Sequence, residues 1–105
     1  MSQYLWLKMA NLVFELEKKL AVQPSSTGVT RNIDRMRGVL EEAGLLLLNP
    51  TGETYQETRT DLEASIAGPG NGSLFILDVI KPVIYTNQDG RRSLIQKGVV
   101  IVGNK

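Results

Sequence analysis

Apolar residues recur at helical spacing over the first part of the chain, with charged residues mostly between them. The stripe consists of Leu5, Met9, Leu12, Val13, Leu16 and Leu20. This period is typical of an amphipathic α-helix and predicts one over about residues 2–22. Tyr4, Trp6, Leu7 and Phe14 widen the apolar surface beyond what one small neighbour would cover. We therefore expect two chains to associate through this helix.

A second helix follows a break at residues 23–28, which contain Pro24 and Gly28. Its apolar stripe consists of Val29, Ile33, Met36, Val39 and Leu40. Gly44 stands where a helix commonly ends in the left-handed conformation. Two helices joined by a short loop predict an antiparallel hairpin over residues 1–44, and we expect this hairpin to be the dimerisation region.

The period of the pattern changes after residue 44. Short runs rich in β-branched and other apolar residues predict strands at 45–48, 74–80, 83–86, 91–95 and 99–102. Pro82 indicates a bend, residues 87–90 a hairpin turn, and residues 96–98 a second turn. Residues 53–67 are polar and do not predict one structure. The expected fold class is α+β, a helical hairpin followed by a small, mostly antiparallel β-domain over residues 45–105.

The amino-acid composition limits which catalytic groups and metal ligands this chain can provide. The chain of 105 residues has no cysteine and no histidine, which excludes thiol nucleophiles, thiolate or imidazole metal sites and the usual proton shuttle near neutral pH. The carboxylate pairs Glu41/Glu42 and Asp61/Glu63 lack companions at the spacing of a calcium loop or a glycosidase. We expect no enzyme activity, no cofactor and no metal, and interpret the chain as a binding module.

Charge is distributed unevenly along the chain. Residues 1–66 carry seven Lys/Arg and nine Asp/Glu, whereas residues 67–105 carry five and two. The β part is therefore mildly basic, too weakly for a dedicated nucleic-acid binder. Lys8 interrupts the first apolar stretch, and this stretch therefore predicts neither a signal segment nor a membrane span. We expect no membrane contact and a cytoplasmic location.

The order of these features resembles the C-terminal half of the GrpE family, the nucleotide exchange factors of DnaK-type chaperones. The resemblance rests on a helix ending in residues 40–44 (Leu-Glu-Glu-Ala-Gly), a Pro/Gly turn, an acidic segment ending in Glu63-Ala64, a Gly-rich gap and a paired-strand finish. In the closing motif, Tyr85, Asp89, Ile95, Val100 and Val102 occupy corresponding places. Ile84 and Gln96 stand where the family has Gly and Arg.

The resemblance implies a co-chaperone that dimerises through helices and binds the nucleotide-binding domain of a DnaK-type chaperone, so that ADP leaves. It places partner contacts around the hairpin, first Arg91 and Arg92, then Tyr85, Gln96 and Lys97. Solvent-exposed arginines and a packing role for Tyr85 are the competing interpretations. For the dimer interface we expect Trp6, Met9, Val13 and Leu16.

Two other functions stay open. One is an assembly scaffold that has this architecture without exchange activity, which the residues at 84 and 96 would fit. The other is a small β-barrel that stacks single-stranded nucleic acid on Tyr85 or Phe75 and holds phosphates with Lys81, Arg91, Arg92 and Lys97. Nucleic acid is the less expected partner because the charge is modest.

Overall fold

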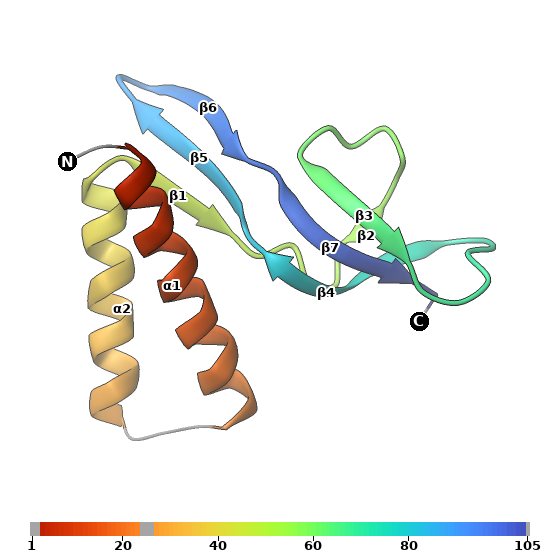
Figure 1. Cartoon of the computed structure of the whole chain (residues 1–105), viewed down its shortest axis with the longest axis horizontal. Helices are drawn as coiled ribbons and strands as arrows, with labels where there is room; N and C mark the ends of the chain where they lie inside the picture. Colours follow the sequence, from red (N-terminus) through yellow and green to blue (C-terminus); the bar gives the residue numbers. More distant parts are fainter. Residues whose placement is uncertain (1–2, 24–26, 105) are drawn as a thin grey trace.

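Two antiparallel helices form the N-terminal part of the molecule. The computed structural model describes residues 3–23 and 27–104. Helix α1 (Gln3–Val22) and helix α2 (Thr27–Glu42) lie side by side (Figure 1). Gly44 follows α2 with φ +88°, as the sequence predicts for its end. Ser2 and residues 24–26 of the predicted break lie outside the described residues.

Seven strands follow and form two sheets. They are β1 (Leu45–Leu48), β2 (Thr54–Tyr55), β3 (Leu62–Ile66), β4 (Leu74–Lys81), β5 (Val83–Gln88), β6 (Arg91–Gln96) and β7 (Gly98–Gly103). One sheet has the order β1-β5-β6 and the other β2-β4-β7-β3. All pairs are antiparallel except β3 with β7. The predicted α+β class, a helical hairpin followed by mostly antiparallel strands, is confirmed.

A bent two-stranded ribbon connects the two sheets. The chain runs from β4 into β5 at Pro82 and from β6 into β7 at Lys97, so each strand of the ribbon leaves one sheet and enters the other (Figure 1). Because Pro82 lacks a backbone N–H, it suits this crossing better than the middle of a ladder. The predicted bend at Pro82 is confirmed.

The predicted second turn at residues 96–98 is wrong, since β6 and β7 do not pair and the chain does not reverse. Gly98 does not form a turn; it allows the chain to pass close to neighbouring side chains. A Cβ added there would lie 2.8 Å from a methyl group of Val83 and 2.9 Å from one of Leu62. The glycine that looks like turn chemistry is the residue that lets the two sheets meet.

Strands also form within the polar segment whose pattern was ambiguous. Thr54 and Tyr55 pair with β4, and Leu62–Ile66 pairs in parallel with β7. Leu62 is buried and Ala64 is half-buried, whereas Glu63 and Ser65 are exposed. This alternation is typical of a strand with one covered face. A five-residue strand with a single large apolar residue facing inward is too weak a signal to separate from a loop.

The hydrophobic core is continuous across the helices and both sheets. Its largest fully buried side chains include Phe14, Leu40, Ile76, Val79, Val83, Ile84, Val100 and Val102. The helices cover the face of β1 and β5 that carries Leu45, Leu47 and Ile84. The opposite face of that sheet is therefore left for other contacts.

Candidate functional site

The uncovered face of the β1-β5-β6 sheet carries the strongest candidate site. Register places Leu46, Tyr85 and Leu94 across the three strands, on the face opposite the buried residues. Arg92 lies on the same face, with its guanidinium carbon 6.0 Å from the centroid of the Tyr85 ring. We call Leu46, Tyr85, Arg92 and Leu94 the outer sheet face. Arg92 and Leu94 are exposed, whereas Leu46 and Tyr85 are half-buried, and Tyr85 also packs against the core as its packing interpretation expects. A tyrosine and an arginine together are typical of protein interfaces.

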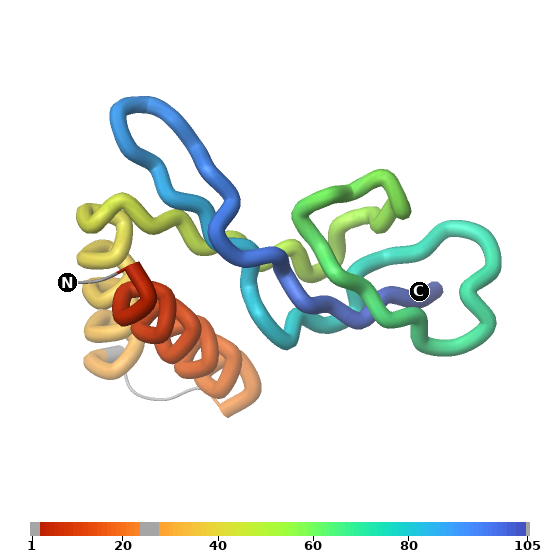
Figure 2. Tube along the Cα trace, turned by 45° about the horizontal axis from the view of Figure 1, so that its top comes forward, coloured from red at the N-terminus to blue at the C-terminus, as the bar shows by residue number. Residues whose placement is uncertain are grey.

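The hairpin between β5 and β6 projects beyond the ends of the two helices (Figure 2). Asp89 with φ 52° and Gly90 with φ 77° form its two-residue tip. Positive φ at both positions is the type I′ geometry that fits the twist of paired strands. The predicted hairpin is confirmed, but its turn is shorter than residues 87–90, because Asn87 and Gln88 continue β5.

Arg91 and Arg92 point to opposite faces of the hairpin, because neighbouring strand residues alternate. Arg92 joins Tyr85, whereas Arg91 lines a shallow hollow on the helix side with Thr86, Gln88 and Ser93. Both arginines are exposed. The structure therefore brings Tyr85 and Arg92 into one surface and leaves Arg91 free to extend that surface around the edge of the hairpin.

Gln96 takes part in a network inside the chain. Its Nε2 donates to Asn11 Oδ1 at 2.9 Å and to the Pro82 carbonyl at 2.9 Å. Asn11 Nδ2 donates to Gln96 Oε1 at 2.9 Å and also to the Leu7 carbonyl at 3.0 Å. Gln96 thus joins α1 to the bend of the ribbon, where it positions the hairpin. Lys97 is exposed at the same bend, away from the hairpin tip.

Two cations join the helices to the strands, and the sequence pattern did not single them out. Arg37 donates to both carboxylate oxygens of Glu17 at 2.8 and 2.7 Å and to the Leu47 carbonyl at 3.0 Å. The hydrogen bonds from Arg37 to Glu17 raise the pKa of this guanidinium above its ordinary value. Lys18 donates to the Val79 carbonyl at 2.7 Å and to Asp78 at 3.2 Å. These contacts fix the direction in which the hairpin leaves the helices.

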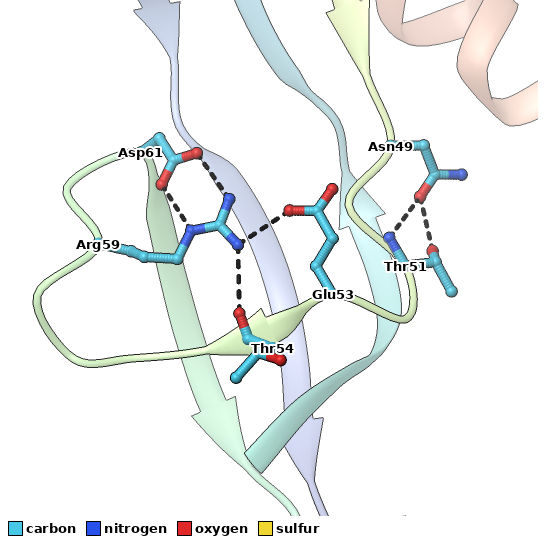
Figure 3. Close-up of polar contacts among 6 residues, drawn as sticks. All are labelled: Asn49, Thr51, Glu53, Thr54, Arg59 and Asp61. Atoms are coloured by element: carbon cyan, nitrogen blue, oxygen red, sulfur yellow. Dashed lines mark hydrogen bonds and ion pairs between the residues drawn. The ribbon is translucent and has the colours of Figure 1, made fainter. Parts of the chain in front are cut away.

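A separate cluster orders the loop between β2 and β3 (Figure 3). Arg59 donates to both oxygens of Asp61 at 3.1 and 2.9 Å, to Glu53 at 3.1 Å and to the Thr54 carbonyl at 3.5 Å. The paired hydrogen bonds from Arg59 hold the pKa of Asp61 below its ordinary value. The donors and acceptors of this cluster satisfy one another, so we interpret it as structural.

The lowered pKa of Asp61 predicts a loss of stability in acid. The folded state binds the Asp61 proton less readily than the unfolded state, so its contribution is complete above the ordinary pKa of 3.8 and disappears as pH falls through the lower folded value. Asp61→Asn should therefore flatten the change in urea midpoint between neutral pH and about pH 3. Glu57→Gln, at an exposed position on the same loop, is the control. Equal acid sensitivity in wild type and Asp61→Asn would contradict the assignment.

Among the described residues, no three or more acidic, histidine or cysteine side chains gather closely enough to hold a metal ion. Neither α1 nor α2, as far as the structure describes them, is long and apolar enough to cross a membrane. Comparison with protein-family models, curated proteins and solved structures finds no match to this chain. The candidate site therefore rests on its own geometry.

Proposed function

We propose that the protein is a GrpE-like co-chaperone that binds the nucleotide-binding domain of a DnaK-type chaperone and promotes ADP release. The observation that carries the proposal is the contact of the exposed Arg92 with the half-buried ring of Tyr85, on a sheet that the helices cover from the other side. The order of helix end, turn, acidic segment and strands supplies the resemblance. The chaperone would meet the outer sheet face and Arg91 in the cytoplasm.

The proposal includes a homodimer formed by the helical hairpins. Each helix has a second apolar stripe that its own core leaves exposed, Leu5, Met9, Leu12 and Leu16 on α1 and Val29, Met36 and Val39 on α2. Steps of three and four residues are the spacing with which helices pack along a common seam. A groove of 350 Å³ between the helices is lined by Trp6, Met9, Met36, Val39 and Leu40. Its lining is almost wholly apolar, which favours a helix of a second copy as its occupant.

Three of the four residues expected at the dimer interface have partly exposed side chains in one chain. Met9 and Leu16 are exposed, and Trp6 is half-buried at the groove. Val13 is fully buried in the core of its own chain, so its side chain does not belong to the exposed stripe of α1. The proposed contact surface therefore consists of the exposed stripe together with Trp6.

Exchange in this proposal is a shift of populations. The protein binds the open state of the chaperone cleft more tightly than the closed state, so the open state becomes more populated and ADP leaves. No bond is made or broken by the protein itself. The attachment of the ribbon to α1 through Gln96 and Lys18, together with that of β1 to α2 through Arg37, gives the hairpin a fixed direction for this contact.

The test is the rate of fluorescent ADP release from a DnaK-type chaperone of the same source. Wild type should accelerate release, and Arg91→Ala/Arg92→Ala should need at least about tenfold more protein for the same acceleration, the effect of losing contacts worth about 1.4 kcal/mol together. Arg31→Ala/Arg35→Ala removes the same charge from exposed positions on α2 and is the matched control. If both double variants were equally active, the proposed contact between the hairpin arginines and the chaperone would be contradicted.

An assembly scaffold without exchange activity is the second candidate. Ile84 is fully buried and Gln96 is engaged within the chain, at the two positions where the sequence departs from the GrpE pattern. A folded dimer that does not accelerate ADP release would favour this candidate. The nucleic-acid alternative needs only Tyr85 or Phe75 for stacking, and these two residues lie in different sheets. It stays the less expected candidate because the charge is modest.

A further inference from the structure

The two edges of the β1-β5-β6 sheet differ in how they are protected. The edge at β1 lies beside α2, and Arg37 donates to the Leu47 carbonyl at 3.0 Å. At the other edge, the exposed part of β6 is bordered by no helix or strand among the described residues (Figures 1 and 2). An open edge presents unpaired backbone groups, which can accept a further strand.

The register shows which backbone groups of β6 face outward. Asn87 N donates to the Gly44 carbonyl at 2.7 Å, so the backbone N–H and C=O of Asn87 face β1. Because these groups alternate in direction along a strand, the N–H and C=O of Thr86 and Gln88 face β6. Thr86 is opposite Ser93, and Gln88 is opposite Arg91. The intervening residues Arg92 and Leu94 therefore direct their N–H and C=O groups away from β5.

The two-residue tip leads to the same assignment independently. In a type I′ hairpin the residues flanking the tip, here Gln88 and Arg91, form a hydrogen-bonded pair. The next pair, Asn87 with Arg92, is then not hydrogen-bonded, and the backbone of Arg92 is free on its outer side. Arg92 and Leu94 therefore each present a backbone donor and acceptor at the outer edge of the sheet.

Charge indicates what kind of strand the edge would accept. β6 contains Arg91 and Arg92 and no carboxylate, and the Leu94 side chain is 37 % exposed beside them. In an added strand, an acidic residue opposite Arg92 and an apolar residue two positions away opposite Leu94 would make favourable cross-strand pairs. An acidic residue next to the first would face Arg91 on the other side of the sheet.

We propose that β6 accepts an extended acidic segment of a partner protein as a fourth strand of the β1-β5-β6 sheet, held by the backbone groups of Arg92 and Leu94. This inference rests on the proposed function in taking the hairpin as the partner-binding surface, and it deepens that function by naming the partner's chemistry and binding mode. The backbone supplies attachment, and the two arginines select acidic sequences.

Capped synthetic peptides test the binding mode. As an antiparallel strand, Thr-Thr-Val-Thr-Glu-Glu-Thr-Thr places its valine opposite Leu94, its first glutamate opposite Arg92 and its second glutamate opposite Arg91. Thr-Thr-Val-Thr-Lys-Lys-Thr-Thr reverses the charge. At about 1 mM, the acidic peptide should bind and slow amide exchange of Arg92 and Leu94 by at least about tenfold, whereas the basic peptide should not. N-methylation of the valine and the first glutamate removes the donors of the added strand and should weaken binding by at least about tenfold. Binding that survives N-methylation, or no binding of the acidic peptide, would overturn the inference.

Proline substitutions test the protein side with a matched control. Leu94→Pro removes an outward N–H and breaks no bond to β5, which an edge strand tolerates. At the two ends of β3, Gly98 N of β7 donates to the Asp61 carbonyl, and Ala67 N donates to the Val102 carbonyl of β7. Alternation therefore directs the backbone of Ala64 away from β7. Ala64→Pro therefore makes the same change at the edge of the other sheet. Leu94→Pro should lose peptide binding and Ala64→Pro should keep it; equal binding by both would overturn the inference.

The exchange assay separates this inference from the proposed function. Leu94→Ala removes the same side chain from the outer sheet face but keeps the outward N–H. If wild type accelerates ADP release and folded Leu94→Pro matches Leu94→Ala, strand addition fails while the proposed function stands. If wild type gives no acceleration and the acidic peptide still protects Arg92 and Leu94, the proposed function fails while strand addition stands. Protection of these amides that rises with protein concentration, without peptide, would show pairing of two copies and overturn the acidic-segment assignment.

Discussion

Leu12→Asp is expected to convert the protein from a dimer into a folded monomer. Leu12 is 53 % exposed in one chain and lies in the middle of the exposed stripe of α1. A two-fold dimer contains this position twice, and burial of a leucine side chain contributes about 1.5–3 kcal/mol each time. Loss of both contributions should raise the dissociation constant by at least about a hundredfold.

Sedimentation velocity over a range of protein concentrations measures this change, and circular dichroism checks that the helices remain. Leu16→Asp, one turn further along the stripe, should act in the same direction. Ile66→Asp is the matched control, because Ile66 is 52 % exposed on β3, in the sheet away from the helices. A dimer of unchanged affinity in Leu12→Asp would refute association through the helical hairpins.

Phe14→Ala should have the largest effect on stability. Phe14 is 1 % exposed and belongs to the core cluster that α1 shares with both sheets, including Ile84 and Val100. Truncation of a buried phenylalanine typically costs about 3–5 kcal/mol, because a cavity remains after the lost burial. Since domains of this size unfold with about 5–15 kcal/mol, the variant should be close to unfolding at room temperature.

Urea unfolding at one fixed protein concentration measures the loss, because dimerisation contributes to apparent stability. Phe14→Leu keeps most of the volume and should cost only about 1 kcal/mol. A graded loss in the order leucine, then alanine, would identify packing as the cause. If Phe14→Ala lost less than about 1 kcal/mol, the continuous core across helices and sheets would be contradicted.

The candidate site was predictable in part. The sequence predicted a hairpin turn within residues 87–90 and the two arginines after it, whereas the type I′ geometry of Asp89 and Gly90 came from the structure. The pairing of Arg92 with the Tyr85 ring required the register, which the two-residue tip sets. The internal use of Gln96 could not be foreseen, because its partner Asn11 is 85 positions away in the chain.

Residues close in sequence determined much of this fold without tertiary information. Side chains three and four positions apart share a helix face, and Gly44 can take the left-handed conformation at a helix end, so the helical hairpin could be deduced from local pattern. The same holds for the β5–β6 hairpin. The absence of cysteine and histidine likewise limited the chemistry from composition alone.

Only the tertiary structure decided how these parts combine. The parallel pairing of β3 with β7 joins residues 36 positions apart, such as Leu62 and Gly98. The close packing of Gly98 against Val83 and Leu62 makes an apparent turn into a crossing between sheets. Such contacts depend on the shape of distant surfaces, which local periodicity does not encode. Whether an apolar residue lies in the core, as Val13 does, or on an exposed stripe, as Leu12 does, was settled by the same packing.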